Sequence, residues 1–264
     1  MSETSKPSRL PEADAVGRTG LPGRQAMPVW CGLTDTKAAY LRPAPEESAP
    51  VEGSATFETH PVRGRFNAWF FTALDSYINW LVRDHKRTVF SGLPAELVEV
   101  GPGVGANFRY LPPGCRLTAI EPNHYMHGAL QRRAARCGVD VQIRSVTGDA
   151  IDLDDQSVDA VISSLLLCTV ADPGHVAREI RRILRPGGRY AFVEHTVAPD
   201  GTVLRGIQRA VRRPWAWAFE GCSCERDLAA VIRAAGFASV EIDQYRLRSP
   251  FVPANTQIAG TAIA

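Results

Sequence analysis

The sequence predicts an α/β protein with a doubly wound sheet of about seven mostly parallel strands. From residue 96 onward, short β-prone apolar runs alternate with helical patterns, the order expected when helices cross over between parallel strands. The first run, 96–100, stops at glycines 101, 103 and 105. A parallel strand that ends in such a turn typically brings its carboxyl end to a nucleotide-like ligand.

The chain before this strand has two parts. Residues 1–56 hold seven prolines among small and charged residues and show no helical or strand period, so we expect a disordered tail and assign it no function. Residues 57–264 form the predicted domain. In residues 65–90, apolar side chains recur at steps of three and four, which predicts a helix over the pocket.

Composition narrows the classes of protein. A net charge of +2 gives no electrostatic reason to expect a nucleic-acid partner. No apolar run approaches the ~18–20 residues of a membrane helix, and we recognise no signal peptide. Six scattered cysteines suit a reducing cytosol better than a disulfide framework, so we expect a cytoplasmic protein. Cys222 and Cys224 lack a second ligand pair at metal spacing, and we predict no metal site.

The remaining elements follow in order. Strands are expected at 96–100, 116–121, 139–146, 158–163 and 189–194. A helix is expected at 123–137, and another begins at Asp172-Pro173, an N-cap followed by proline in the first turn. It ends at Arg185-Pro186-Gly187-Gly188, a predicted turn. An amphipathic helix at 203–213 is expected to break or restart at Pro214. Residues 237–245 and 255–264 predict a terminal hairpin with the last strand antiparallel.

An acid at the tip of the second strand indicates a ribose. Glu121 ends the run 116–120, twenty residues beyond Gly101. A carboxylate there is placed to accept hydrogen bonds from two ribose hydroxyls. The pattern Gly101-x-Gly103-x-x-Ala106 also fits the dinucleotide fingerprint, so these features alone leave NAD open, as well as a tight turn without a ligand.

Further motifs separate these alternatives. Gly148-Asp149-Ala150 follows the third strand, the 185–188 turn precedes the fifth, and the hairpin closes the chain. Together with the glycine loop and Glu121, they make residues 66–264 resemble a class I S-adenosylmethionine-dependent methyltransferase. NAD-binding domains share the first two features and usually lack the rest. The resemblance implies a Rossmann-like fold, helical cover over the pocket, and S-adenosyl-L-methionine as cofactor.

Six more segments lie in order with near-family spacing: Gly105-Ala106-Asn107-Phe108, Leu111-Pro112-Pro113-Gly114-Cys115, Glu121-Pro122-Asn123, Leu165-Leu166-Leu167-Cys168-Thr169-Val170, Glu194-His195 and Glu220-Gly221-Cys222. Together they resemble the methyltransferase-like seven group of thiol S-methyltransferases and their bacterial and fungal relatives. Pro102 and Val104 depart from the usual Gly-Cys-Gly-Thr-Gly loop and remove a backbone donor and a hydroxyl. Animal members carry an N-terminal membrane anchor where this chain has its polar, proline-rich tail.

The resemblance assigns roles at the cofactor. Glu121 is expected to bind the ribose diol. Asp149, with the Ala150 backbone, is expected to read the adenine amino edge, a solvated loop acid being the alternative. The tip of the fourth strand is expected beside the sulfonium. The predicted cofactor residues are Glu99, Gly101, Pro102, Gly103, Gly105, Asn107, Glu121, Pro122, Asn123, Gly148, Asp149, Ala150, Ser163, Ser164 and Leu165.

The acceptor pocket is predicted from aromatic residues, which suit both a sulfonium neighbour and an apolar acceptor. Core packing and an ordinary cover helix are the alternatives. The predicted pocket residues are Trp69, Tyr77, Trp215, Phe219 and Cys222. Where relatives often carry a polar residue after the tryptophan, this chain has Ala216.

His195 is the candidate catalytic residue, for deprotonating or orienting the acceptor, and a structural histidine is the alternative. We interpret Cys168 and Cys222 as buried packing residues and not as nucleophiles.

The leading functional hypothesis is methyl transfer to a small, mostly apolar thiol, because a free thiol is already a few per cent thiolate at pH 7. The alternative acceptor is a lipid amine, a quinone or another natural-product oxygen or carbon. The arginine face of 205–213 would also suit a peripheral membrane contact. A non-catalytic S-adenosylmethionine-binding protein and an NAD-dependent oxidoreductase are further alternatives. The sequence makes no prediction about oligomeric state.

Overall fold

The computed structural model describes residues 61–264, so the predicted tail and residues 57–60 of the predicted domain lie outside the described residues. The elements are α1 (Pro61–Val89), β1 (Glu96–Val100), the 3-10 turn η2 (Phe108–Tyr110), β2 (Arg116–Ile120), α2 (His124–Cys137), β3 (Asp140–Arg144), β4 (Val158–Ser164), α3 (Pro173–Ile183), β5 (Leu184–His195), α4 (Val203–Ala218), α5 (Leu228–Ala234), β6 (Ser239–Arg246), η3 (Val252–Ala254) and β7 (Thr256–Ile263).

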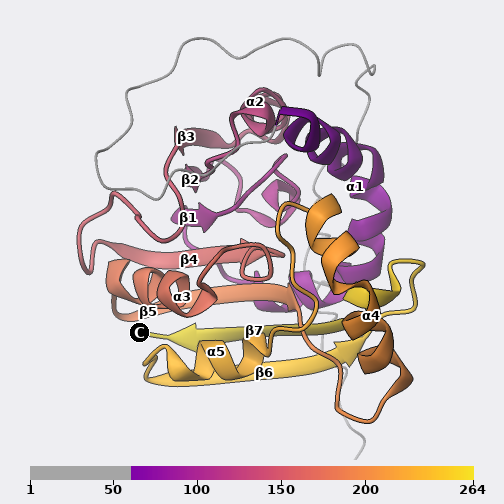
Figure 1. The fold of residues 1–264 in the computed structure, drawn as a ribbon. Coiled ribbons are helices and arrows are strands. Elements are labelled where there is room, and N and C mark those ends of the chain that lie inside the picture. Colours follow the sequence, from indigo (N-terminus) through magenta and orange to yellow (C-terminus); the bar gives the residue numbers. More distant parts are fainter. Residues whose placement is uncertain (1–60) are drawn as a thin grey trace, which may run out of the picture.

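One seven-stranded sheet organises these elements (Figure 1), with the strand order β3-β2-β1-β4-β5-β7-β6. Strands β1 to β5 pair in parallel, and β7 lies antiparallel between β5 and β6. The α/β sheet with an antiparallel last strand is therefore confirmed.

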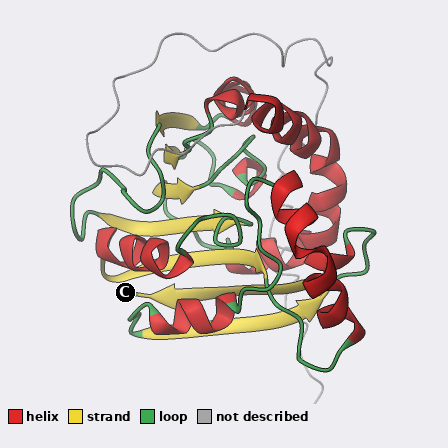
Figure 2. Ribbon diagram, in the orientation of Figure 1, coloured by secondary structure: helices red, strands yellow, loops and turns green. Residues whose placement is uncertain are grey.

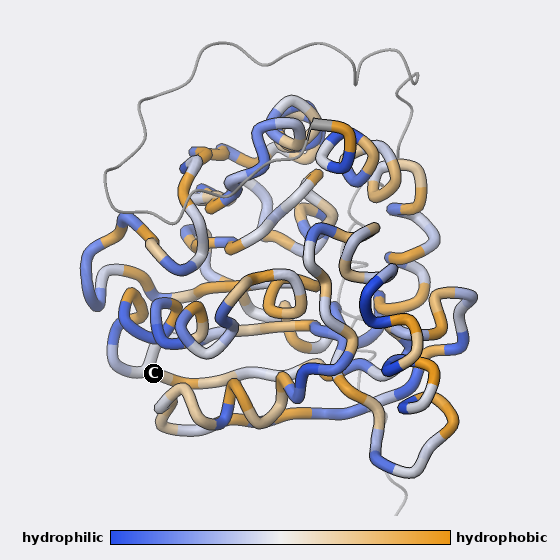
Figure 3. The backbone as a smooth tube through the Cα atoms, viewed as in Figure 1, coloured by the Kyte–Doolittle hydropathy of each residue, from blue (hydrophilic) through white to orange (hydrophobic). Residues whose placement is uncertain are grey.

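Helices cover both faces of the sheet (Figure 2), with α3 and α5 on one face and α1 and α2 on the other. Side chains alternate along each strand, so Val98 and Val100 of β1 pack toward α3 and α5, while Leu97 packs toward α1 and α2. The central strand β4 is mainly hydrophobic (Figure 3), as expected for a parallel strand that is buried on both faces.

The predicted turn at 185–188 differs from the structure, because strand β5 begins at Leu184, directly after α3. Leu184 pairs with Val158 of β4, and the register shifts before the regular pairs resume at Ala160 and Arg189. The Gly187 amide, in a residue with φ +80°, donates to the Ala264 carbonyl at 2.9 Å. The motif is thus an irregular start of the strand, held by partners on both sides.

Pro214 neither breaks nor restarts its helix, since α4 continues from Val203 through Ala218. Proline lacks the amide that would bond the carbonyl of residue 210. Ala210 and Pro214 are both exposed, so water can bond the freed carbonyl and the helix can continue. Its last turn therefore reaches the pocket.

Helices α1 and α4 stand at the carboxyl ends of the parallel strands (Figure 1), and the Asn67 side-chain amide of α1 donates to the Ala218 carbonyl of α4 at 3.3 Å. Within residues 61–264, no helix has the length and hydropathy required to cross a membrane. The two helices enclose the space in which the candidate site lies.

Candidate active site

A cavity of about 650 Å³ lies beyond the carboxyl ends of β1, β2, β4 and β5. Strand ends and the loop after β1 form one side of it, and α1, α4 and the segment after α4 form the other. This is the volume of a pocket that holds a drug-sized ligand, and its position is the one at which open α/β sheets bind ligands.

Glu121 is fixed at the wall of this cavity by two backbone amides. Gly103 N donates to one carboxylate oxygen and Asn123 N to the other, each at 2.9 Å. Burial raises the pKa of Glu121 to about 7, although both hydrogen bonds oppose the rise. An acceptor group at the end of β2, beside a glycine loop, has the chemistry that a ribose diol requires.

Gly101 shows why this loop needs glycine. Its φ is +69°, and a Cβ at this position would lie 2.7 Å from Leu166 Cδ1. A side chain would therefore strain the backbone and press the β1 loop against the loop after β4. Glycine at this position thus lets the β1 loop lie close against the loop after β4.

The predicted cofactor residues separate into two groups. Those that line the cavity are Gly101, Pro102, Gly103, Asn107, Glu121, Pro122, Asn123, Gly148, Asp149, Ser164 and Leu165. Those outside its lining are Glu99, Gly105, Ala150 and Ser163. Ser163 lies on the α3 side of β4, where its hydroxyl meets Tyr190 Oη at 2.7 Å and donates to Glu194 at 3.2 Å. Ser163 thus bonds Tyr190 and Glu194, and its predicted contact with the cofactor stays a prediction.

Glu99 is connected to the cavity by two consecutive buried hydrogen bonds. Asn107 Nδ2 donates to Glu99 Oε1, and Lys86 Nζ of α1 donates to Asn107 Oδ1, each at 2.7 Å. Burial raises the pKa of Glu99 to about 7 and lowers the pKa of Lys86 to about 8. Lys86 and Asn107 line the cavity. The Lys86 ammonium group therefore gives the cavity a cation suited to the cofactor's methionine carboxylate.

Two charged residues of α1, Lys86 and Asp75, were not predicted from the sequence. Arg133 of α2 donates to both Asp75 carboxylate oxygens, at 3.0 and 3.2 Å, and Arg109 donates to the same group. Charged residues that lie within an apolar helical stripe are a sequence signal for such a network. Asp75 and Lys86 share one face of α1 with apolar residues at helical spacing, and this face lines the cavity. Its cavity-lining residues include Asn67, Phe71, Asp75, Ile78, Val82 and Lys86.

This face explains why two predicted pocket residues lie elsewhere. Trp69 is 44 % exposed, Tyr77 stacks on Trp80, and neither lines the cavity. Each stands two positions from a lining residue, and two positions turn an α-helix by about 200°. Phe70 and Phe71 of the same helix line the cavity in their place.

The segment after β5 supplies the predicted aromatic wall. Trp215 and Phe219 line the cavity with ring centroids 4.5 Å apart. Phe70 lies 5.4 Å from Phe219 and 5.8 Å from Phe251. Three segments far apart in sequence thus form one aromatic surface over the strand ends.

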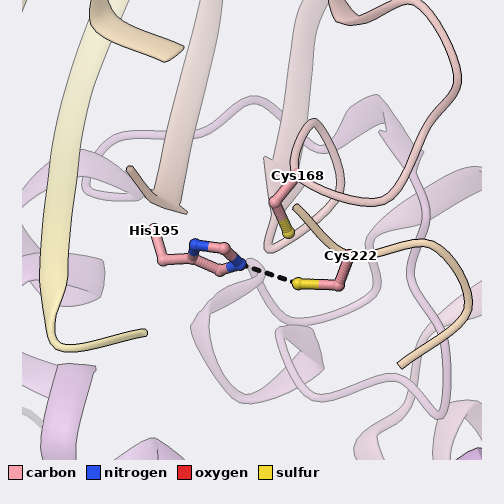
Figure 4. Close-up of side chains that lie close together, drawn as sticks. All are labelled: Cys168, His195 and Cys222. Carbon is pink, nitrogen blue, oxygen red and sulfur yellow. Dashed lines mark hydrogen bonds between the residues drawn. The ribbon is translucent and has the colours of Figure 1, made fainter. Parts of the chain in front are cut away.

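Beside this wall, the side chains of Cys168, His195 and Cys222 point toward one another (Figure 4) and line the same cavity. His195 Nε2 lies 2.8 Å from Cys222 Sγ, and Trp215 Nε1 donates to that sulfur at 3.3 Å. The thiol of Cys168, together with His195 and Trp215, lowers the pKa of Cys222 to about 4. Burial opposes protonation of His195, but the Cys222 sulfur outweighs it and raises the histidine's pKa. His195 Nδ1 has no hydrogen-bond partner among the described residues.

The loop after β4 carries Cys168 and is held by β5. Leu165 has a φ of +57°, uncommon for a residue with a side chain. Its amide donates to the Val193 carbonyl at 2.9 Å, and the Leu166 amide donates to Glu194 Oε1 at 3.0 Å. Burial raises the pKa of Glu194 to about 7. These bonds fix the loop at the wall of the cavity.

Comparisons with known proteins agree with this architecture. The family model of the methyltransferase domain matches residues 98–192. Thiol S-methyltransferase TMT1B of Rattus norvegicus is 32 % identical over 170 residues, which cover 63 % of this chain and 70 % of that protein. Human thiol S-methyltransferase TMT1B is 29 % identical over 214 residues, covering 77 % and 88 %. A putative methyltransferase of Haloferax volcanii, solved with its Trm112 activator, shares the fold with a TM-score of 0.56 at 19 % identity, over 75 % of this chain and 97 % of that one.

The sheet order, the cavity at the strand ends and these matches define the class: the chain belongs to the S-adenosylmethionine-dependent methyltransferases. S-adenosylmethionine is the methyl donor, and the enzyme is a methyltransferase. Within that class, the TMT1B proteins of human and mouse, each matched over 77 % of this chain, are thiol S-methyltransferases.

Proposed function

We propose that this enzyme transfers the methyl group of S-adenosylmethionine to the sulfur of a small, mostly apolar thiol. The observation that carries the proposal is the aromatic wall of Phe70, Trp215 and Phe219, which lines the same cavity as Glu121. Such a wall suits an apolar acceptor and excludes water from the reacting atoms. The activity named for the TMT1B relatives supports sulfur as the acceptor atom.

The donor supplies an electrophilic methyl carbon when it is bound. The protein's tasks are then orientation and desolvation. Glu121 would hold the ribose, Asp149 would face the adenine edge, and Lys86 would face the methionine carboxylate. The aromatic wall would hold the acceptor. A thiol near pKa 8.5 is already a few per cent thiolate at neutral pH, so the reaction makes little demand for a general base.

Three acceptors with the same apolar body test which acceptor atom receives the methyl group. The purified full-length protein is incubated with S-adenosylmethionine carrying a labelled methyl group and with benzyl mercaptan, benzyl alcohol or benzylamine, and mass spectrometry identifies the products. We expect methyl transfer to the mercaptan only. The three acceptors share one apolar body, so a difference among them reports the acceptor atom.

A second set of acceptors, phosphatidylethanolamine and a demethylated quinone, tests the alternative class. Faster methylation of either than of any thiol would overturn the thiol assignment. Calorimetry with S-adenosylhomocysteine accompanies both assays. Tight binding without turnover on any acceptor would favour a protein that only binds the cofactor.

A further inference from the structure

In the proposed methyl transfer, the protein orients and desolvates the two substrates, and the cluster of Cys168, His195 and Cys222 has no chemical task. The three side chains come from the loop after β4, the end of β5 and the segment after α4. Their two sulfurs and one ring nitrogen all lie within 4.8 Å of one another. All three residues are buried, at 6 % relative exposure or less, and line the cavity. Three soft or borderline ligand atoms thus converge at the wall of a ligand pocket.

Hydrogen bonds from the backbone and from two side chains hold the cluster in place. The Ser223 amide donates to the Cys168 carbonyl at 2.7 Å, which joins the two cysteine-bearing segments. Arg226 Nη1 donates to the carbonyls of Leu167 and Cys168, at 3.0 and 3.1 Å. Trp215 Nε1 donates to Cys222 Sγ, as an outer-shell donor to a metal-bound thiolate does. The cluster is therefore supported before any ligand enters.

We propose that Cys168, His195 and Cys222 bind a zinc ion whose fourth coordination position faces the cavity. Two thiolates and an imidazole form a donor set that suits Zn²⁺, and three protein ligands with one open position are typical of catalytic zinc sites. Zinc–sulfur bonds of about 2.3 Å and zinc–nitrogen bonds of about 2.0–2.1 Å place tetrahedral ligand atoms roughly 3.6 Å apart. His195 Nε2 and Cys222 Sγ, 2.8 Å apart, therefore separate slightly on binding.

The open position gives the site a task, and this step rests on the proposed thiol acceptor. An acceptor R–S–H that binds the ion as its fourth ligand releases its proton to water. Its sulfur lone pair then forms the new S–CH₃ bond while the bond from the methyl carbon to the sulfonium sulfur breaks. The products are a methyl thioether and S-adenosylhomocysteine. The ion thus selects a thiol over an alcohol of the same shape.

Cobalt substitution tests the site without measuring activity. The full-length protein is reduced, stripped with a chelator and titrated with Co²⁺, which gives thiolate-to-cobalt charge-transfer absorption when cysteine binds it. We expect one equivalent to bind and Zn²⁺ to displace it. Cys168→Ser and Cys222→Ser should each weaken Co²⁺ binding at least about tenfold. Cys115→Ser and Cys224→Ser are matched controls, because both thiols are buried outside the cavity lining, and they should bind Co²⁺ as the wild type does.

The other outcomes of the cobalt titration distinguish a metal site from a hydrogen-bonded thiol pair. S-adenosylhomocysteine binding by calorimetry shows that a variant is folded. A folded protein without the absorption, or with full absorption in both cysteine variants, overturns the metal site and leaves a hydrogen-bonded thiol pair. Benzyl mercaptan should change the cobalt spectrum, and benzyl alcohol should not. An unchanged spectrum removes the acceptor from the metal site. Cobalt binding in an enzyme that methylates no thiol would instead overturn the proposed function and leave the site standing.

Discussion

The two halves of the cavity are built in different ways. The cofactor half depends on backbone geometry and strand ends: the Gly101 turn, the amides that hold Glu121, and the loop that carries Asp149. The acceptor half depends on side chains from α1, the end of β5 and α4, which meet only in the folded protein. A ligand common to a whole family can be bound by a fixed backbone, whereas a variable acceptor needs side chains that can change.

Removing Glu121 tests the cofactor half where it depends most on one side chain. Glu121→Ala removes the acceptor for both ribose hydroxyls, and hydrogen bonds to a charged group contribute about 1.5–3 kcal/mol each. The dissociation constant of S-adenosylhomocysteine should rise about 10²–10⁴-fold by calorimetry. Glu96→Ala, at an exposed glutamate that pairs with Arg116, is the control. A change below threefold in Glu121→Ala would contradict the assigned ribose contact.

Glu99, in the cofactor half, should make the free energy of unfolding depend on pH. Burial raises its pKa from the usual 4.5 to about 7, so between these values the folded protein binds more protons than the unfolded chain. The stabilisation is therefore complete below pH 4.5 and is lost as pH rises through 7, a change of about 3 kcal/mol.

Glu99→Gln removes this group. The difference in the free energy of unfolding, wild type minus variant, should fall by about 3 kcal/mol between pH 4.5 and 8 in urea titrations. Glu194 remains in both proteins and is not among the charges that shift Glu99, so its titration cancels in the comparison. Parallel pH profiles for the two proteins would show that Glu99 is already ionised at low pH.

The ionisation of Glu121 should make cofactor binding depend on pH. Its pKa is about 7 without ligand, and only the carboxylate can accept both hydroxyls. The dissociation constant of S-adenosylhomocysteine should therefore be about tenfold higher at pH 6 than at pH 8. Calorimetry across this range checks the profile, and Glu121→Ala should flatten it. A wild-type profile without this rise would separate Glu121 from the ligand.

The acceptor half should respond to substitution without disturbing the cofactor. Trp215→Ala opens the aromatic wall, and loss of a buried aromatic contact should raise the KM for an apolar thiol about three- to tenfold. Trp217→Ala is the matched control, because Trp217 lies on the same helix and is 70 % exposed. S-adenosylhomocysteine binding should stay unchanged in both variants. Equal effects in the two would show that α4 itself, and not the wall, is what matters.

The cofactor half was largely predictable because its signals are local. Glycines at 101 and 103 and the acid at 121 lie at the ends of consecutive strands, and the parallel sheet brings them together. Ser163, predicted to contact the cofactor, lies outside the cavity lining because one step along a strand turns a side chain to the opposite face. Trp69 and Tyr77 lie outside the lining for the helical equivalent of the same reason.

The acceptor half carried weaker signals. Cys168, His195 and Cys222 are separated by 27 residues at each step, too far for any short ligand motif, and no periodicity shows that their segments meet. In the cofactor half, Asp75 and Lys86 lie on a helix whose apolar pattern predicts only cover over the pocket, so their polar contacts were not predicted. In both cases tertiary packing brings together residues that local sequence keeps apart.

The loop after β4 has a consequence for how the two ligands affect each other. Leu166 of this loop touches the space above Gly101, and Cys168 lines the acceptor side. Leu165 and Leu166 are both hydrogen-bonded to β5, so the loop and that strand end form one connected body. Whatever factor the donor imposes on acceptor affinity through this body, the acceptor must impose on donor affinity, since the coupling free energy is reciprocal.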